Sequence, residues 1–183
     1  MIALCDVKFR TIELPGHSPG QQCLYQPDAR IILAGDSVLL QGTPAMIFYS
    51  KAQDTVADQL ESFDKLSDVA VNLCLSGHGP AMSGLEFRKR VERHRQHVSN
   101  RVCAVLAALH DHPEGLTLAQ TASAIPWQGK TGGFDQMDER RRYFALAEVY
   151  VILKHFIAIG EVHRTVGTEG SVPVFAETRK EKS

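Results

Sequence analysis

The 183-residue chain lacks the features of membrane proteins and of disulfide-stabilised proteins. It has no run of about 18 apolar residues, and its first residues lack the basic and apolar segments of a signal peptide. Its four cysteines form no Cys-x-x-Cys pair, which indicates reduced, structural thiols. They are Cys5, Cys23, Cys74 and Cys103. These absences predict a cytoplasmic globular protein with no membrane partner.

An excess of charge of one sign is also absent, because the formal net charge is −1. Residues 1–85 carry five Lys or Arg against nine Asp or Glu, a net charge of −4. Residues 86–183 carry 15 against 12, a net charge of +3. The second part of the chain would tolerate a polyanionic partner, but its charge does not demand one.

Three short β-rich runs each end in a glycine that is followed directly by a potential metal ligand. The ligands are His17, Asp36 and His78. Glycine permits a tight turn where a strand ends, and sites in open α/β folds lie beyond the carboxyl ends of strands. We therefore expect the three side-chain tips to converge within roughly 8 Å. Two imidazoles and a carboxylate suit zinc, with manganese or iron as alternatives.

The motifs around these ligands, LPGHSPG, LAGD and SGHGP, resemble the last three metal motifs of the metallo-β-lactamase-fold hydrolases. The resemblance implies that His17 binds one Zn²⁺ ion, that His78 binds a second, and that Asp36 bridges both. It also implies hydrolysis by a metal-bound hydroxide that Asp36 orients, which makes Asp36 the catalytic candidate. Ser18 and Ser76 are candidates for hydrogen bonds that position the ligands.

The first metal motif of that family, His-x-His-x-Asp-His, does not occur in the chain. Its nearest imitation, residues 110–112, follows a helical stretch and is interpreted as a solvated helix end. The resemblance therefore implies the second half of an αββα sandwich, with half of the metal ligands missing. Whether such a chain holds metal or is an enzyme stays open. We expect it to self-associate or to need a partner that supplies the missing half.

Residues 1–83 show an α/β pattern. Strands are predicted at 7–14 and 69–75, and a hairpin at 22–26 and 31–34. Asp54 is a suitable N-cap for one intervening helix. The predicted apolar stripe of that helix is Val56, Leu60, Phe63 and Leu66.

Residues 84–183 predict a separate winged-helix-like domain. A long helix from residue 85 is followed by a capping box at 117–120 and a loop at 128–136. A second long helix is expected over 138–159, and a hairpin is expected from 161 to 177 around residues 167–170. Arg140, Arg141 and Arg142 open the second long helix and would suit phosphates. The rest of this helix is apolar nearly all round, which favours packing or dimerisation over nucleic-acid binding.

Three functions remain open from the sequence. The chain could belong to a metallo-hydrolase that acts on a small thioester, ester, lactone or phosphodiester. It could be a non-catalytic remnant that mediates oligomerisation or binds a partner, or it could bind nucleic acid through the winged helix.

Overall fold

The computed structural model describes residues 1–127, 132–166 and 172–178. It separates into two compact units, Met1–Ser99 and Asn100–Ser183, called here the first and second unit. The sequence places a domain boundary at residues 83 and 84, where the long helix begins. The predicted hairpin turn at 167–170 and part of the loop at 128–136 lie outside the described residues.

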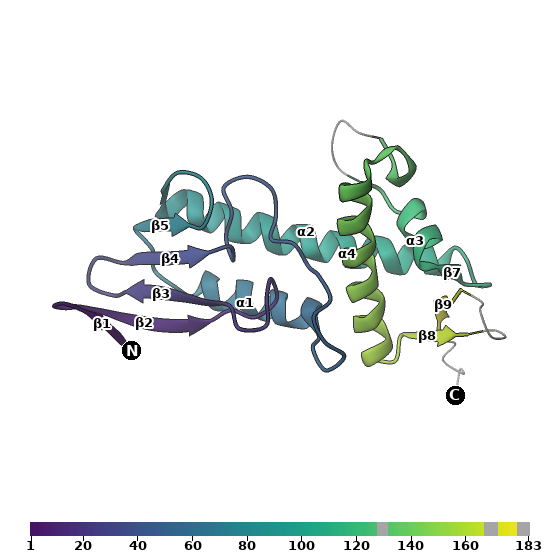
Figure 1. Ribbon diagram of the computed structural model, residues 1–183, viewed down its shortest axis with the longest axis horizontal. Helices are drawn as coiled ribbons and strands as arrows, with labels where there is room; N and C mark the ends of the chain where they lie inside the picture. The colour runs from purple at the N-terminus through teal and green to yellow at the C-terminus, as the bar shows by residue number, and fades with distance from the viewer. Residues whose placement is uncertain (128–131, 167–171, 179–183) are drawn as a thin grey trace. The chain divides into compact units, whose positions relative to one another are not determined.

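The first unit contains one six-stranded sheet (Figure 1). Its strands are β1 (Ile2–Leu4), β2 (Val7–Glu13), β3 (Gln22–Gln26), β4 (Ile31–Gly35), β5 (Leu73–Ser76) and β6 (Met82–Ser83). They are hydrogen-bonded in sequence order, and β4 and β5 pair in parallel while the other neighbours are antiparallel. The parallel pair brings the carboxyl ends of β4 and β5 to the same edge, where two of the predicted ligands follow.

Helix α1 (Thr55–Ser67) and the first part of α2 (Gly84–His110) lie on one side of this sheet (Figure 1). Side chains from β3, β4 and β5 alternate between the buried and the more exposed face, as the two-residue period of a strand requires. The buried face carries Cys23, Tyr25, Ile32, Ala34 and Cys74. Among the side chains of the other face, Leu73 and Leu75 are 37% and 40% exposed.

The single helix predicted before residue 80 is confirmed, and one position of its apolar stripe is wrong. Asp54 caps α1 by accepting a hydrogen bond from the Ala57 amide. Val56, Phe63 and Leu66 are fully buried, but Leu60 is only half-buried and Gln59 occupies the buried position instead. The reason is that Gln59 packs against the Gly16 turn before His17, so that the buried position of the helix is filled by an amide and not by a leucine.

The predicted hairpin is confirmed by β3 and β4, whereas the strand predicted over 69–75 begins only at Leu73. Residues 69–72 are neither helix nor strand: the Val69 amide donates to the Leu66 carbonyl near the end of α1, and the Asn72 amide donates to the Arg30 carbonyl. The short strands β1 and β6 were not predicted.

The second unit combines three helical segments and a three-stranded antiparallel sheet with the end of α2. The added elements are β7 (Leu116–Thr117), α3 (Leu118–Ala124), the 3₁₀ turn η1 (Phe134–Gln136), α4 (Glu139–Ala158), β8 (Val162–Thr165) and β9 (Val174–Glu177). The strand order is β7-β9-β8. The capping box is confirmed, since Thr117 and Gln120 exchange hydrogen bonds at the start of α3. Gly160, with φ of +78°, follows α4 where the sequence predicts its end.

The chain thus has a mixed α/β fold, and all four cysteines are free thiols. Burial raises the pKa of Cys23 to about 11 and that of Cys74 to about 12, which makes both thiols unreactive near neutral pH. None of the helices in the described ranges is long and apolar enough to cross a bilayer.

Candidate metal centre

Close-packed glycine turns place the three predicted ligands. Gly16 has φ of +129°, and a Cβ atom there would lie 2.7 Å from the Cα of Gln59. Gly35 has φ of +53°, and its Cβ would lie 2.7 Å from the Gln21 side chain. Neither position accepts another residue without strain. A Cβ on Gly77 would lie 2.3 Å from Asp36 Oδ1, so this glycine leaves the space that the carboxylate fills.

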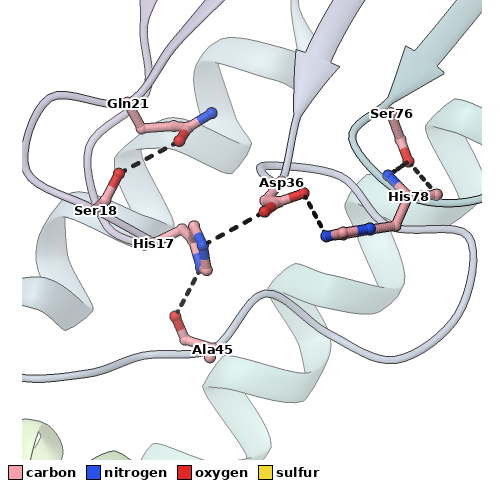
Figure 2. A network of polar contacts seen from close by, with 7 residues as sticks. All are labelled: His17, Ser18, Gln21, Asp36, Ala45, Ser76 and His78. Carbon is pink, nitrogen blue, oxygen red and sulfur yellow. Dashed lines mark hydrogen bonds and ion pairs between the residues drawn. The ribbon is translucent and has the colours of Figure 1, made fainter.

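The carboxylate of Asp36 lies between the two histidines (Figure 2). Its Oδ2 is 3.9 Å from His17 Nε2, and its Oδ1 is 3.6 Å from His78 Nε2. Both pairs lie well within the predicted 8 Å. A backbone hydrogen bond of 2.7 Å from the Gly77 amide to the Gly35 carbonyl ties the two turns together. Each carboxylate oxygen therefore faces a different imidazole, as a bridging ligand between two positions would.

The ring of His17 is oriented by the main chain of Ala45. His17 Nδ1 lies 3.2 Å from the Ala45 carbonyl oxygen, which can only accept, so Nδ1 carries a proton. In the neutral ring, Nε2 then carries the lone pair, and it lies 3.9 Å from Oδ2 of the Asp36 carboxylate. Such a contact is unfavourable unless a proton or a cation lies between the two atoms. Hydrogen bonds of this kind from the second ring nitrogen are typical of metal-binding histidines.

His78 is held less firmly. Its side chain is 79% exposed, whereas that of His17 is 25% exposed. Ser76 fixes the main chain of the turn, because its hydroxyl donates to the His78 carbonyl and accepts from the His78 amide. A pocket of about 170 Å³ adjoins the His78 ring. It is lined by Leu40, Gln41, His78, Gly79 and Pro80.

The two predicted positioning serines contact the loops and not the imidazole nitrogens. Ser18 donates to Gln21 Oε1 at 3.3 Å, and the Ser76 hydroxyl hydrogen-bonds the main chain of His78. The Ala45 carbonyl was missed, and no sequence pattern marks a carbonyl 28 residues away. Ser62 was missed too; its hydroxyl donates to the Pro15 carbonyl at 2.6 Å and supports the loop before His17.

The three side chains would give each of two metal positions two ligands, with Asp36 shared between them. His17 and Asp36 would hold one ion, and Asp36 and His78 the other. Among the described residues, no three His, Cys, Asp or Glu side chains are grouped closely enough to hold one ion together. Since protein zinc sites use three or four protein ligands, the centre is incomplete by this count.

The other candidate residues lie in the second unit. Arg141 pairs with Asp138 at 3.5 Å, and Arg142 donates to the Asp135 carbonyl, so both guanidinium groups have local partners. Arg140 is exposed.

Comparison with known proteins gives sequence relatives for part of the chain and solved structures with a similar fold. No family model matches the chain. It is 33% identical over 93 residues to the probable metallo-hydrolase YflN of Bacillus subtilis, covering 42% of this chain and 33% of YflN. It is 38% identical over 50 residues to the hydroxyacylglutathione hydrolase of Brucella ovis, covering 24% and 20% of the two chains. A crystal structure of a metallo-β-lactamase family protein from Thermus thermophilus superimposes with a TM-score of 0.74 at 23% identity.

The chain has a metallo-β-lactamase fold. The superposition covers 97% of this chain and 52% of the Thermus protein. The chain therefore spans about half the length of that metallo-β-lactamase protein and a third or less of the two sequence relatives. The descriptions of these relatives indicate hydrolases of the metallo-β-lactamase superfamily.

Proposed function

We propose that this chain contributes the His17, Asp36 and His78 ligands to a dinuclear metallo-hydrolase. The observation that carries the proposal is the Asp36 carboxylate, whose two oxygens face two different histidines at 3.9 and 3.6 Å. The donor set favours Zn²⁺, with Mn²⁺ or Fe²⁺ as alternatives. Such ions, when bound, supply an activated water and a Lewis acid for the scissile oxygen.

The residues of the chain have separate roles in this proposal. Asp36 would supply one carboxylate oxygen to each position and would orient the attacking water by accepting its hydrogen bond. His17, with Nδ1 bound to the Ala45 carbonyl, presents Nε2 in the tautomer that binds metal. The pocket beside His78 receives part of a small substrate, and its Leu40 and Pro80 walls favour an uncharged group. Thioesters, esters, lactones and phosphodiesters fit this chemistry.

Metal analysis and hydrolysis test the proposal. The purified chain should bind Zn²⁺ by competition with a chromogenic chelator, and Asp36→Asn should weaken binding at least tenfold. Asp111→Asn, an exposed carboxylate change in the second unit, is the matched control and should have no effect. Hydrolysis of a panel of thioester, ester, lactone and phosphodiester substrates should depend on added metal. Equal affinities in the parent and Asp36→Asn would overturn the proposal.

We further propose that another β-sheet covers the exposed side of the first-unit sheet. Leu24, Leu33 and Leu75 are cross-strand neighbours, and Ile31 is paired with Leu73. These five residues are called here the apolar face. Leu73 and Leu75 are exposed and the other three are half-buried, and neighbouring apolar side chains of this kind are often covered by another protein surface. Sheets pack face to face at about 10 Å through such surfaces. The occupant we propose is a second copy of this chain.

Light scattering tests this association. The parent chain alone should form oligomers at tens of micromolar, and Leu75→Lys should reduce them. Leu85→Lys removes an equally apolar side chain, 57% exposed on α2, and should leave association unchanged. A monomeric parent with a cooperative melt and no binding of a dye for apolar surfaces would contradict the proposal.

For the second unit we propose a winged-helix-like packing domain. The order helix, β7, α3, α4, β8, β9 and the β7-β9-β8 sheet support this interpretation. The local partners of Arg141 and Arg142 argue against their availability for phosphates. Salt-sensitive retention on DNA or RNA that Arg140→Glu abolishes would favour the nucleic-acid alternative instead.

A further inference from the structure

His94 is a fully buried histidine that the proposed hydrolysis does not use. It lies on α2 with an exposed fraction of 1%, and its ring is 6.0 Å from that of Phe63. Its Nδ1 has no hydrogen-bond partner among the described residues. A buried polar atom without a partner is costly, so a simple core position would be filled more favourably by leucine or phenylalanine.

The other ring nitrogen of His94 contacts a main-chain segment of the candidate site. Nε2 lies 3.2 Å from the Leu39 amide nitrogen and 3.1 Å from the Leu39 carbonyl oxygen. The ring can therefore accept from the amide in one tautomer or donate to the carbonyl in the other. This contact joins residues that are 55 positions apart in the sequence.

Leu39 lies at the centre of a short segment that serves the site at both ends. Asp36 precedes it by three residues, and Leu40, which follows it, lines the pocket beside His78. The segment is not part of a helix or a strand, so no ladder of backbone hydrogen bonds holds it. The Ser37 amide donates to the Ala34 carbonyl at the start of the segment, and side-chain contacts must hold the rest of it.

We propose that His94 is a positioning residue, which holds residues 36–40 through its contact with the Leu39 main chain and thereby orients both Asp36 and the wall of the His78 pocket. Its effect on metal binding rests on the proposed function. The contact between His94 and Leu39 does not depend on that function. Burial lowers the pKa of His94 to about 4, which keeps the ring neutral and able to use either tautomer near neutral pH.

Amide hydrogen exchange of the full chain tests the contact directly. His94→Leu should accelerate exchange of the amides of residues 37–40 by roughly tenfold or more, because the segment loses its anchor. His94→Gln, which keeps a side-chain amide near the position of Nε2, should restore part of the protection. Val91→Ala is the matched control: it removes buried volume from the same helix and has no polar contact with the segment.

Zn²⁺ affinity provides the second measurement. His94→Leu should weaken Zn²⁺ binding roughly tenfold or more, the effect typical of residues that orient metal ligands, whereas Val91→Ala should not. Unchanged exchange at 37–40 in His94→Leu would overturn the proposal. So would equal acceleration in Val91→Ala, which would make the role of His94 one of core packing alone. If the parent binds no Zn²⁺, the proposed function fails, while the exchange comparison still decides the role of His94.

Discussion

The buried polar groups of the two units differ in how well they are satisfied. In the second unit, Arg101 is buried and contacts Glu148, the Pro126 carbonyl and the Trp127 ring, at 3.1, 2.5 and 4.0 Å. Thr121, also buried, donates to the Thr117 carbonyl at 2.9 Å.

In the first unit, four buried side-chain atoms lack a partner within the described part of the chain. Three of the residues that carry them adjoin the candidate site: Ser37 follows Asp36, Gln59 packs on the Gly16 turn, and His94 contacts Leu39. Native interiors normally satisfy such atoms. The difference indicates that the interior of the second unit serves stability, whereas that of the first unit is arranged around a site.

The largest expected effect is in the second unit. Arg101→Met should reduce the free energy of unfolding by about 3–5 kcal/mol, because it leaves the largely buried Glu148 without this partner. Urea unfolding followed by fluorescence measures it, since the single tryptophan, Trp127, contacts Arg101. Arg101→Lys, which keeps the charge but not the guanidinium geometry, should lose less. A loss below about 1 kcal/mol would contradict the conclusion that the buried polar contacts of Arg101 stabilise the second unit.

Acid should destabilise the first unit through His94. Burial, and then the charges of Arg90 and His97, lower its pKa from 6.5 to about 4, against an opposing contribution from the Leu39 contact. Because the unfolded state binds the proton more tightly, stability is fully present above pH 6.5 and falls as pH decreases toward 4. The difference is about 3 kcal/mol. Thermal melts from pH 7.5 to 4 test this, and the fall should be smaller in His94→Leu.

Gly77→Ala should disturb the site more than the fold. The added Cβ would lie 2.3 Å from Asp36 Oδ1, the oxygen that faces His78, so the carboxylate or the turn must shift. We expect a loss of about 1–3 kcal/mol in stability and weaker Zn²⁺ binding. Gly20→Ala is the control, because nothing lies within 4 Å of its Cβ. Equal behaviour of the two variants would show that the Gly77 turn relaxes without cost.

The smallest changes in stability are expected when one buried hydroxyl is removed from each unit. Thr121→Val removes a satisfied hydrogen bond and should cost about 1 kcal/mol. Ser37→Ala removes a hydroxyl that has no partner among the described residues, and stability should stay within about 0.5 kcal/mol or rise. Denaturant midpoints measure both changes. A clear loss in Ser37→Ala would mean that this hydroxyl is satisfied and would weaken the contrast between the units.

Features that depend on neighbouring residues could be predicted from the amino-acid order. The glycine turns before His17, Asp36 and His78, the Asp54 cap and the Thr117 capping box all follow local rules of backbone conformation. The approach of His17 and His78 to Asp36 also followed, because β2, β4 and β5 run in the same direction and their carboxyl ends lie at one edge of the sheet.

How firmly the site is held depends on contacts between residues that are far apart in the sequence. The contact of His17 with the Ala45 carbonyl spans 28 residues, and that of His94 with Leu39 spans 55. Such contacts depend on how helices and loops pack, and a main-chain carbonyl has no identity that a sequence pattern could mark. The same packing placed Gln59, not Leu60, against the Gly16 turn and left Leu73 and Leu75 exposed on the apolar face. Burial is set by what covers a side chain, and the local sequence does not contain that information.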